Sequence, residues 1–218
     1  MGAAHLSGLY FINAPFASKA TVERGSVYLC YNLLMKKSRI LQMTLCALLA
    51  AMTAALSQIA IPIGPVPFNL ATFAVFLAGA LLGSKLGALS LTIWAALGAV
   101  GVPVFSSFRS GLGALAGPTG GFIIGFIPAA FLTGLIIEKL NKKNQAHIYV
   151  IAMLAGTLVY FSLGTAWFMF SAGAGLFEAL TVCVFPFIPG DLLKLAVATI
   201  LVKRLRPLLN RVPVKGEE

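Results

Sequence analysis

The chain has 218 residues, of which 59% are hydrophobic and only 10% are charged, and its mean hydropathy is +0.95. Soluble globular domains carry about 25% charged residues, so this composition excludes that class and indicates an integral membrane protein. The net charge of +10 does not indicate nucleic-acid binding, because no segment offers the clustered basic face that such binding needs.

Residues 1–34 precede the first long apolar run and have no sustained apolar run of their own. They contain a proline and several charged residues, and they lack the layout of a signal peptide. Residues 35–39 (MKKSR) are typical of a chain start in front of a first span. We therefore predict a leader or extension at 1–34 and a single transmembrane domain at 35–218.

Six apolar runs follow the leader, and a helical span needs about 20 mostly apolar residues. The runs cover residues 40–61, 68–82, 86–101, 118–137, 148–170 and 188–202. The second, third and sixth are short, so we expect these helices to pack inside the bundle or to lie at its edge. The pattern predicts an all-α membrane protein with six transmembrane helices.

The first predicted helix carries Ala47, Ala51 and Ala55 at intervals of four residues. This spacing of small residues lets helices approach closely. Packing within the chain and docking of another subunit explain it equally well.

Glycines recur with the same spacing of four residues at Gly79, Gly83, Gly87, Gly113, Gly117, Gly121 and Gly125. For these glycines we favour helix packing over a ligand role.

Two segments between the runs differ from their surroundings. Residues 62–67 (PIGPVP) contain three prolines, which exclude a helix and favour a stiff, extended bend that can form half of a lid. Residues 102–117 are rich in serine and glycine and contain Arg109. Irregular backbone at membrane depth is tolerated only where protein or a wet cavity covers it, so we expect one or the other to cover this second loop.

The basic residues predict the orientation of the chain in the membrane. An even number of spans with the N terminus inside places most of them in the cytoplasm, namely Lys36, Lys37, Arg39, Lys85, Lys139, Lys142, Lys143, Lys203, Arg204, Arg206, Arg211 and Lys215. Of the basic residues after the leader, only Arg109 lies in the opposite loops. This bias follows the positive-inside rule and predicts that both termini are cytoplasmic.

No motif for an enzyme or for a cofactor is found. Residues 79–85 (GALLGSK) resemble a phosphate-binding loop, but the lysine is in the wrong register, so we do not expect the chain to hydrolyse ATP. His5 and His147 have no partner for metal binding or base catalysis. The three cysteines have no metal-ligand spacing, so we predict neither a metal nor a cofactor.

Asp191 and Lys194 are the only charges in residues 185–202. An ionised Asp or Lys near the centre of a membrane helix costs roughly 2.5 to 3.5 kcal/mol, so such residues usually face a cavity, a partner or a ligand. Their spacing of three places them on one helix face. Simpler roles stay open: Asp191 follows Pro189-Gly190 and suits a helix N-cap, and Lys194 can snorkel outward or form a structural ion pair.

The candidate substrate-binding residues are the polar groups in or near the apolar runs, namely Asn69, Thr72, Arg109, Tyr160, Asp191 and Lys194. We interpret Glu178, also near an apolar run, as an exposed loop residue. If the three charged candidates converge, they form a site with one anion and two cations. Such a site suits a ligand with a carboxylate, a neutral group that donates hydrogen bonds and an apolar body.

The sequence resembles the BioY family, the biotin-binding S components of energy-coupling factor (ECF) vitamin transporters. The matching stretches are 65–68 (PVPF), 73–83 (FAVFLAGALLG), 115–122 (LAGPTGGF) and 187–194 (FIPGDLLK). Together they extend the resemblance over nearly all of residues 35–206. It differs at Ala71, where relatives often carry Gln, and at 106–110, where the third loop is usually richer in glycine.

The resemblance implies a six-helix S-component fold in the cell membrane, with a biotin site near the outer face that two outward loops close. Asp191 and Lys194 then match the ligand-binding acid and lysine of the family, and Arg109 falls at a ligand-contacting position of the third loop. The alanine stripe resembles the surface that docks on the coupling subunit EcfT, and two ATPase subunits supply the ATP.

We therefore expect high-affinity capture of biotin without ATP. Charge complementarity assigns the ureido N–H groups of biotin to Asp191 and its valerate to Lys194 or Arg109. The alternative is a proton-coupled secondary transporter of a small carboxylate, with Asp191 as the titrating group; the absence of an obvious inverted repeat disfavours it. An intramembrane enzyme lacks a paired acid, a metal cluster or an activated nucleophile.

Overall fold

The structure is a computed structural model that describes residues 40–61, 66–141 and 143–211, all within one unit, 38–218. The predicted leader at 1–34 and most of the predicted proline bend lie outside the described residues. The described part is mainly helical, and each predicted apolar run contains one helix. In chain order the helices are Ile40–Gln58, α2 (Ala71–Leu82), α3 (Ser84–Val100), α4 (Leu112–Ala116), α5 (Gly120–Leu140), α6 (Ala146–Ala172), α7 (Leu176–Cys183) and α8 (Ile188–Arg211).

The helices differ in how far they could extend through a membrane. Ile40–Gln58, α5 and α6 are long and apolar enough to cross one, and α7 with α8 counts as a fourth span if this pair, bent by 48°, is taken together. At about 1.5 Å per residue, the 12 residues of α2 reach only about 18 Å, less than the roughly 30 Å hydrocarbon core. The chain is a multi-pass membrane protein, and the six-span count and the cytoplasmic termini stay predictions.

A short hairpin precedes α2. The strands β1 (Ala60–Ile61) and β2 (Phe68–Asn69) pair antiparallel, with Ala60 opposite Asn69. These strands were not predicted, because two residues are too few to show an alternating pattern. The hairpin places Asn69 at the start of α2.

α5 is the centre of the packing and contacts α2, α3 and α6. Close approach depends on glycine: a Cβ added at Gly79 would lie 2.6 Å from the carbonyl oxygen of Ala130, and one at Gly121 would lie 2.2 Å from Cβ of Trp167. The helix-packing interpretation is confirmed at these positions. It is wrong at Gly113, where nothing lies within 4 Å; at Gly83, which ends α2 with φ +85°, an added Cβ would meet the side chain of Glu138 on α5, so close packing holds there too.

The tight turn between α2 and α3 is held by Glu138, an acid that was not predicted to have a role. Ser84 donates its N–H to Oε1 of Glu138 (2.9 Å) and its hydroxyl to Oε2 (2.7 Å). The carboxylate thus lies at the N terminus of α3, where the helix dipole favours an anion. Glu138 belongs to α5 and is 54 residues from Ser84, so no local pattern could reveal the contact.

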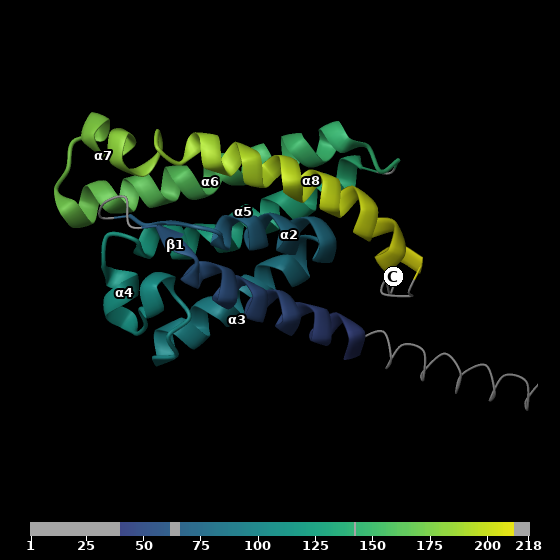
Figure 1. Cartoon of the computed structure of the whole chain (residues 1–218), viewed down its shortest axis with the longest axis horizontal. Helices are drawn as coiled ribbons and strands as arrows, with labels where there is room; N and C mark the ends of the chain where they lie inside the picture. The colour runs from purple at the N-terminus through teal and green to yellow at the C-terminus, as the bar shows by residue number, and fades with distance from the viewer. Residues whose placement is uncertain (1–39, 62–65, 142, 212–218) are drawn as a thin grey trace, which may run out of the picture. The chain divides into compact units, whose positions relative to one another are not determined.

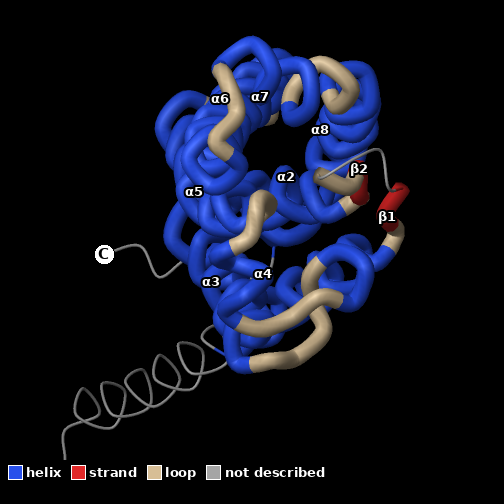
Figure 2. The backbone as a smooth tube through the Cα atoms, turned by 90° about the vertical axis from the view of Figure 1, so that its left-hand side faces the viewer, coloured by secondary structure: helices blue, strands red, loops and turns tan. Residues whose placement is uncertain are grey.

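α7 is a helix, although a loop was predicted around Glu178. Glu178 is exposed, as predicted, but it belongs to the first turn of α7. Figure 1 shows α7, α4 and β1 at the same end of the helices, opposite the C-terminal end of α8. Figure 2 views the chain from that end, and the candidate site lies among these segments.

Candidate ligand-binding site

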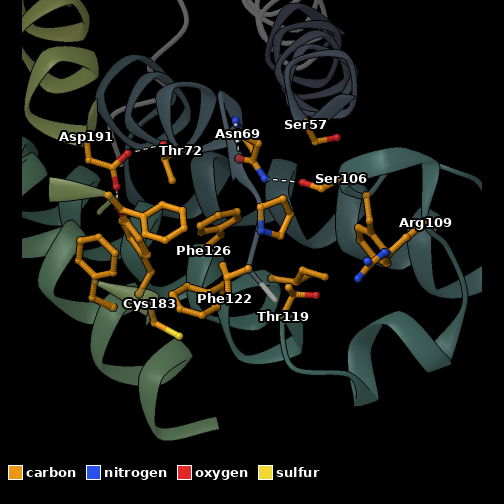
Figure 3. A pocket seen from close by; sticks show the side chains of 18 of the residues that line it. Ser57, Asn69, Thr72, Ser106, Arg109, Thr119, Phe122, Phe126, Cys183 and Asp191 are labelled. Carbon is orange, nitrogen blue, oxygen red and sulfur yellow. Dashed lines mark hydrogen bonds between the residues drawn. The ribbon is translucent and has the colours of Figure 1, made fainter. Parts of the chain in front are cut away.

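One pocket brings together all six residues that were predicted to bind substrate. Asn69, Thr72, Arg109, Tyr160, Asp191 and Lys194 all line it. They come from β2, α2, the loop before α4, α6 and α8, so the pocket depends on segments far apart in the sequence. Figure 3 shows Asp191 and Arg109 at opposite ends, with aromatic side chains between them.

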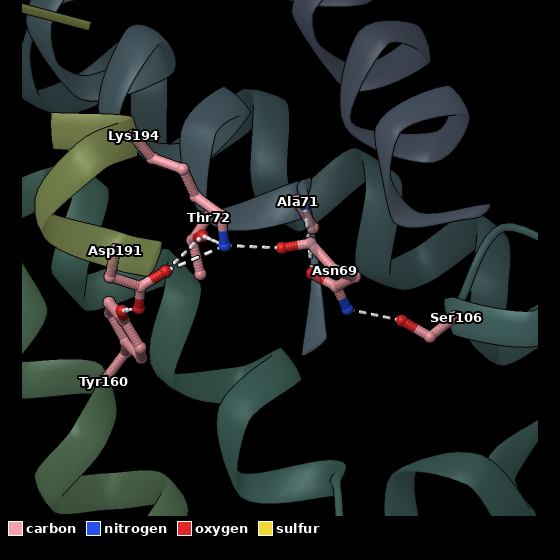
Figure 4. A network of polar contacts seen from close by, with 7 residues as sticks. All are labelled: Asn69, Ala71, Thr72, Ser106, Tyr160, Asp191 and Lys194. Atoms are coloured by element: carbon pink, nitrogen blue, oxygen red, sulfur yellow. Dashed lines mark hydrogen bonds and ion pairs between the residues drawn. The ribbon is translucent and has the colours of Figure 1, made fainter. Parts of the chain in front are cut away.

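The carboxylate of Asp191 is the centre of the polar end. Its side chain is only 4% exposed. Oδ1 accepts from the hydroxyl of Thr72 (3.1 Å) and from Nζ of Lys194 (2.8 Å), and Oδ2 accepts from the hydroxyl of Tyr160. Figure 4 shows this network. A carboxylate has about four acceptor positions, so roughly one remains, on Oδ2.

The N-cap interpretation of Asp191 is wrong. α8 begins at Ile188, and the N–H of Asp191 already donates to the carbonyl oxygen of Phe187 at 2.8 Å. The residue therefore belongs to the first helical turn, where the helix dipole still favours its charge. Its side chain faces the pocket instead of capping the backbone.

Lys194 points inward and does not snorkel. Its Nζ donates to Oδ1 of Asp191 (2.8 Å), to the hydroxyl of Thr72 (2.9 Å) and to the carbonyl oxygen of Asn69 (2.6 Å). It also lies 4.0 Å from the ring centroid of Phe68. An ammonium has three N–H donors, so all three have partners, and the Asp191–Lys194 pair is neutral as a whole.

Asn69 connects the polar end to the second loop. Its Oδ1 accepts the N–H of Ala71 (3.0 Å), and its Nδ2 donates to the hydroxyl of Ser106. The segment before α2 and the loop before α4 therefore meet at the pocket. Ser106 was missed as a candidate, because a serine in a polar loop gives no sign of its partner.

Arg109 lies at the other end and is exposed. Within the described parts of the chain, its guanidinium forms no ion pair; the one salt bridge there joins Lys194 and Asp191. Arg109 is therefore the cation of the pocket that is not already neutralised by a carboxylate.

The wall between the two ends is aromatic. Trp94 and Phe126 have ring centroids 6.0 Å apart, and Phe126 meets Tyr160 edge-on at 5.5 Å. The further large side chains of the lining are Phe105, Phe122, Phe161 and Phe187. Ser57 and Thr119 also line the pocket and were missed, because both lie at helix ends where hydroxyl groups are common.

The arrangement suits the binding of a small molecule. It offers a buried acceptor end, an apolar middle and a cationic mouth, as expected for a small-molecule pocket in which a few polar groups set orientation. Across residues 40–61, 66–141 and 143–211, no group of three or more His, Cys, Asp or Glu side chains could hold a metal ion.

Comparison with known proteins identifies the family. The BioY family model matches residues 32–211. The biotin transporter BioY of Rhodobacter capsulatus is 43% identical over 173 residues, which cover 74% of this chain and 91% of that protein. The biotin transporter BioY of Thermotoga maritima is 41% identical over 150 residues, covering 69% and 86%.

A solved structure gives the same result at the level of the fold. The crystal structure at 2.1 Å of the S-component for biotin from an ECF-type ABC transporter is 30% identical and superposes with a TM-score of 0.74, covering 78% of this chain and 93% of that one. This likeness confirms the predicted S-component fold. The chain belongs to the BioY family.

Proposed function

We propose that the chain captures biotin in the membrane as the S component of an ATP-driven ECF transporter. The observation that carries the proposal is a buried ion pair, Asp191 with Lys194, at the closed end of an aromatic pocket in a chain of the BioY family. Buried intramembrane charge is costly and usually functional. A ligand that hydrogen-bonds to the pair gives this charge a role.

The bicyclic head of biotin enters first. Its ureido N–H groups are neutral donors, and the acceptor position left on Oδ2 of Asp191 takes one of them in a charge-assisted hydrogen bond. Lys194 pairs with the carboxylate and holds it in place. Tyr160 and Thr72, which already donate to the same carboxylate, orient it.

The valerate chain then runs along the aromatic wall to the mouth, where its carboxylate meets Arg109. Both Lys194 and Arg109 have the charge for this role. The three donors of Lys194 already have protein partners, whereas no carboxylate in the described residues pairs with Arg109. This contrast favours Arg109 as the cation that binds the ligand acid.

Transport depends on other subunits in this proposal. Ala47, Ala51 and Ala55 are exposed on the first described helix, which favours docking over packing within the chain, and we assign them to the contact with EcfT. Two ATPase subunits supply the energy, and this chain contributes binding without a cofactor or an enzymatic step. We place it in the cell membrane with six spans and cytoplasmic termini, residues 1–34 being a leader outside the 35–218 domain.

The test is the small molecule that the purified chain retains. The protein is expressed in biotin-containing medium, purified in detergent without partner subunits, and denatured for mass spectrometry of the released ligand. We expect biotin, at close to one per chain. Release of a different small molecule, or capture that requires a partner subunit, would contradict the proposal.

A further inference from the structure

The loop between α3 and α4 is held in a conformation that its residues do not favour. Ser107 and Phe108 have φ values of 60° and 57°. The left-handed region is disfavoured for residues with a Cβ atom, and two such residues in succession are rarer still. Strained backbone persists where surrounding contacts hold it, and it is frequent at ligand-binding sites.

The side chain of Gln58 forms a hydrogen bond with the strained backbone. It is the last residue of the helix Ile40–Gln58, and its Oε1 accepts the N–H of Phe108 at 2.9 Å. Its Nε2 donates to the carbonyl oxygen of Pro103 (3.3 Å), on the other arm of the same loop. One side-chain amide therefore connects both arms of the loop to the first described helix.

The neighbouring residue, Ser57, holds the loop in the same region. Its hydroxyl donates to the carbonyl oxygen of Val104 at 2.5 Å, and Nε1 of Trp94 donates to that same oxygen at 3.1 Å. On the pocket side, Ser106 accepts from Asn69. Ser106 thus faces the pocket, whereas the side chain of Phe108 is 70% exposed. The left-handed conformation of residues 107 and 108 therefore reverses the side-chain direction between Ser106 and Phe108.

Arg109 directly follows the reversal. Its backbone is tied to the loop, since the N–H of Phe105 donates to the carbonyl oxygen of Arg109 at 3.1 Å. Among the described residues, however, no salt bridge holds the guanidinium itself. The direction of the Arg109 side chain is therefore set by the backbone before it, which is the segment that Gln58 holds.

We propose that Gln58 is a positioning residue, which holds the strained Ser107–Phe108 pair so that Arg109 faces the mouth of the pocket and receives the ligand carboxylate. The inference rests on the proposed function, because it assumes that Arg109 binds the acid of biotin. Gln58 itself lies outside the pocket lining. Its effect is therefore specific to the charged end of the ligand.

The test compares a charged ligand with a neutral one. Purified wild-type chain, Gln58→Met, Arg109→Met and the double variant are titrated with biotin and with biotin methyl ester. Methionine keeps the length of glutamine but cannot accept the Phe108 N–H. Gln145→Met, at an exposed glutamine before α6, is the matched control and should bind both ligands like the wild type.

We expect Gln58→Met to weaken biotin binding by about 3- to 10-fold, the net effect of one hydrogen bond, and to leave methyl ester binding within about 1.5-fold of the wild type. In the Arg109→Met background, Gln58→Met should have no further effect on biotin, because residues that act through one contact are not additive. If Gln58→Met does not fold, Gln58→Asn, which is too short to reach Phe108, takes its place.

Equal weakening of both ligands would overturn the inference, since it would indicate a general structural role for Gln58, and so would unchanged biotin binding. If Arg109→Met weakens both ligands equally or neither, the assignment of the carboxylate to Arg109 fails and the inference with it, although capture of biotin stands. If the wild type does not bind biotin, the proposed function itself fails.

Discussion

The spacing of Asp191 and Lys194 predicts that they share a helix face, but it does not by itself predict that they form a buried ion pair. The two side chains form an ion pair at 2.8 Å while both are more than nine-tenths buried, and the hydroxyl groups of Thr72 and Tyr160 also donate to the carboxylate, which keeps one acceptor position for a ligand. Removing one member of such a pair leaves an uncompensated charge, whereas replacing both by apolar residues is often tolerated. Stability and binding should therefore respond differently to the two kinds of substitution.

Lys194→Met should lower the free energy of unfolding by about 3–5 kcal/mol, because Asp191 keeps a buried charge without its cation. The double variant Asp191→Leu/Lys194→Met should recover most of that loss but should not bind biotin. Thermal unfolding in detergent and a biotin titration, run on the same preparations, measure both effects. A double variant that still binds biotin at wild-type affinity would exclude the pair from the site.

At the scale of secondary structure, the α2–α3 turn depends on close contact with α5. A Cβ added at Gly134 would lie 2.4 Å from the backbone carbon of Gly83 and 2.4 Å from the nitrogen of Ser84. These are backbone atoms in a tight turn that Glu138 also holds, so they cannot move cheaply.

Gly134→Ala should therefore destabilise the fold by about 1–3 kcal/mol, the usual cost of overpacking. Gly113→Ala is the matched control, because nothing lies within 4 Å of the added Cβ there and the helix α4 accepts alanine. The melting temperatures of the two variants test this prediction, and that of Gly134→Ala should be the lower. Equal melting temperatures would show that the turn is more adaptable than its contacts indicate.

The sequence could predict the helices of this fold better than their connections. Apolar runs locate helices because hydrophobicity is a property of each segment by itself, and all six runs contain one. α7 was missed because it is short and follows a stretch of small residues with two glycines (171–175, SAGAG). The contact between Glu138 and Ser84 was missed because it joins segments far apart in the sequence.

The residues in and around the pocket also differ in whether the sequence alone could predict them. Asp191 and Lys194 could be identified since charge in an apolar run is conspicuous, and Arg109 could be identified as the one basic residue predicted in the outward loops. Gln58 and Ser106 are ordinary polar residues in sequence, and only their partners across the fold, Phe108 and Asn69, indicate a role. The choice between Lys194 and Arg109 for the ligand acid likewise depends on hydrogen-bond partners that sequence does not contain.

At the scale of the whole molecule, the exposed alanine stripe of the first described helix has the smooth surface that docking of another helical subunit needs. Ala51→Trp should block assembly with the coupling and ATPase subunits while biotin binding by the isolated chain is unchanged. Leu158→Trp, at a position on α6 that is 68% exposed, should assemble normally. Co-purification with tagged ATPase subunits measures assembly, and a normal yield of complex with Ala51→Trp would remove the stripe from the interface.

The central claim is that a buried carboxylate in this pocket binds biotin, and its most direct test is calorimetric titration of the purified chain and of Asp191→Asn, without nucleotide or partner subunits. The wild type should bind one biotin per chain. Asp191→Asn keeps the size of the side chain but loses its charge, so its affinity should fall by about 10- to 150-fold, the value of a hydrogen bond to a charged group, roughly 1.5–3 kcal/mol. Equal affinities of the two proteins would contradict the account.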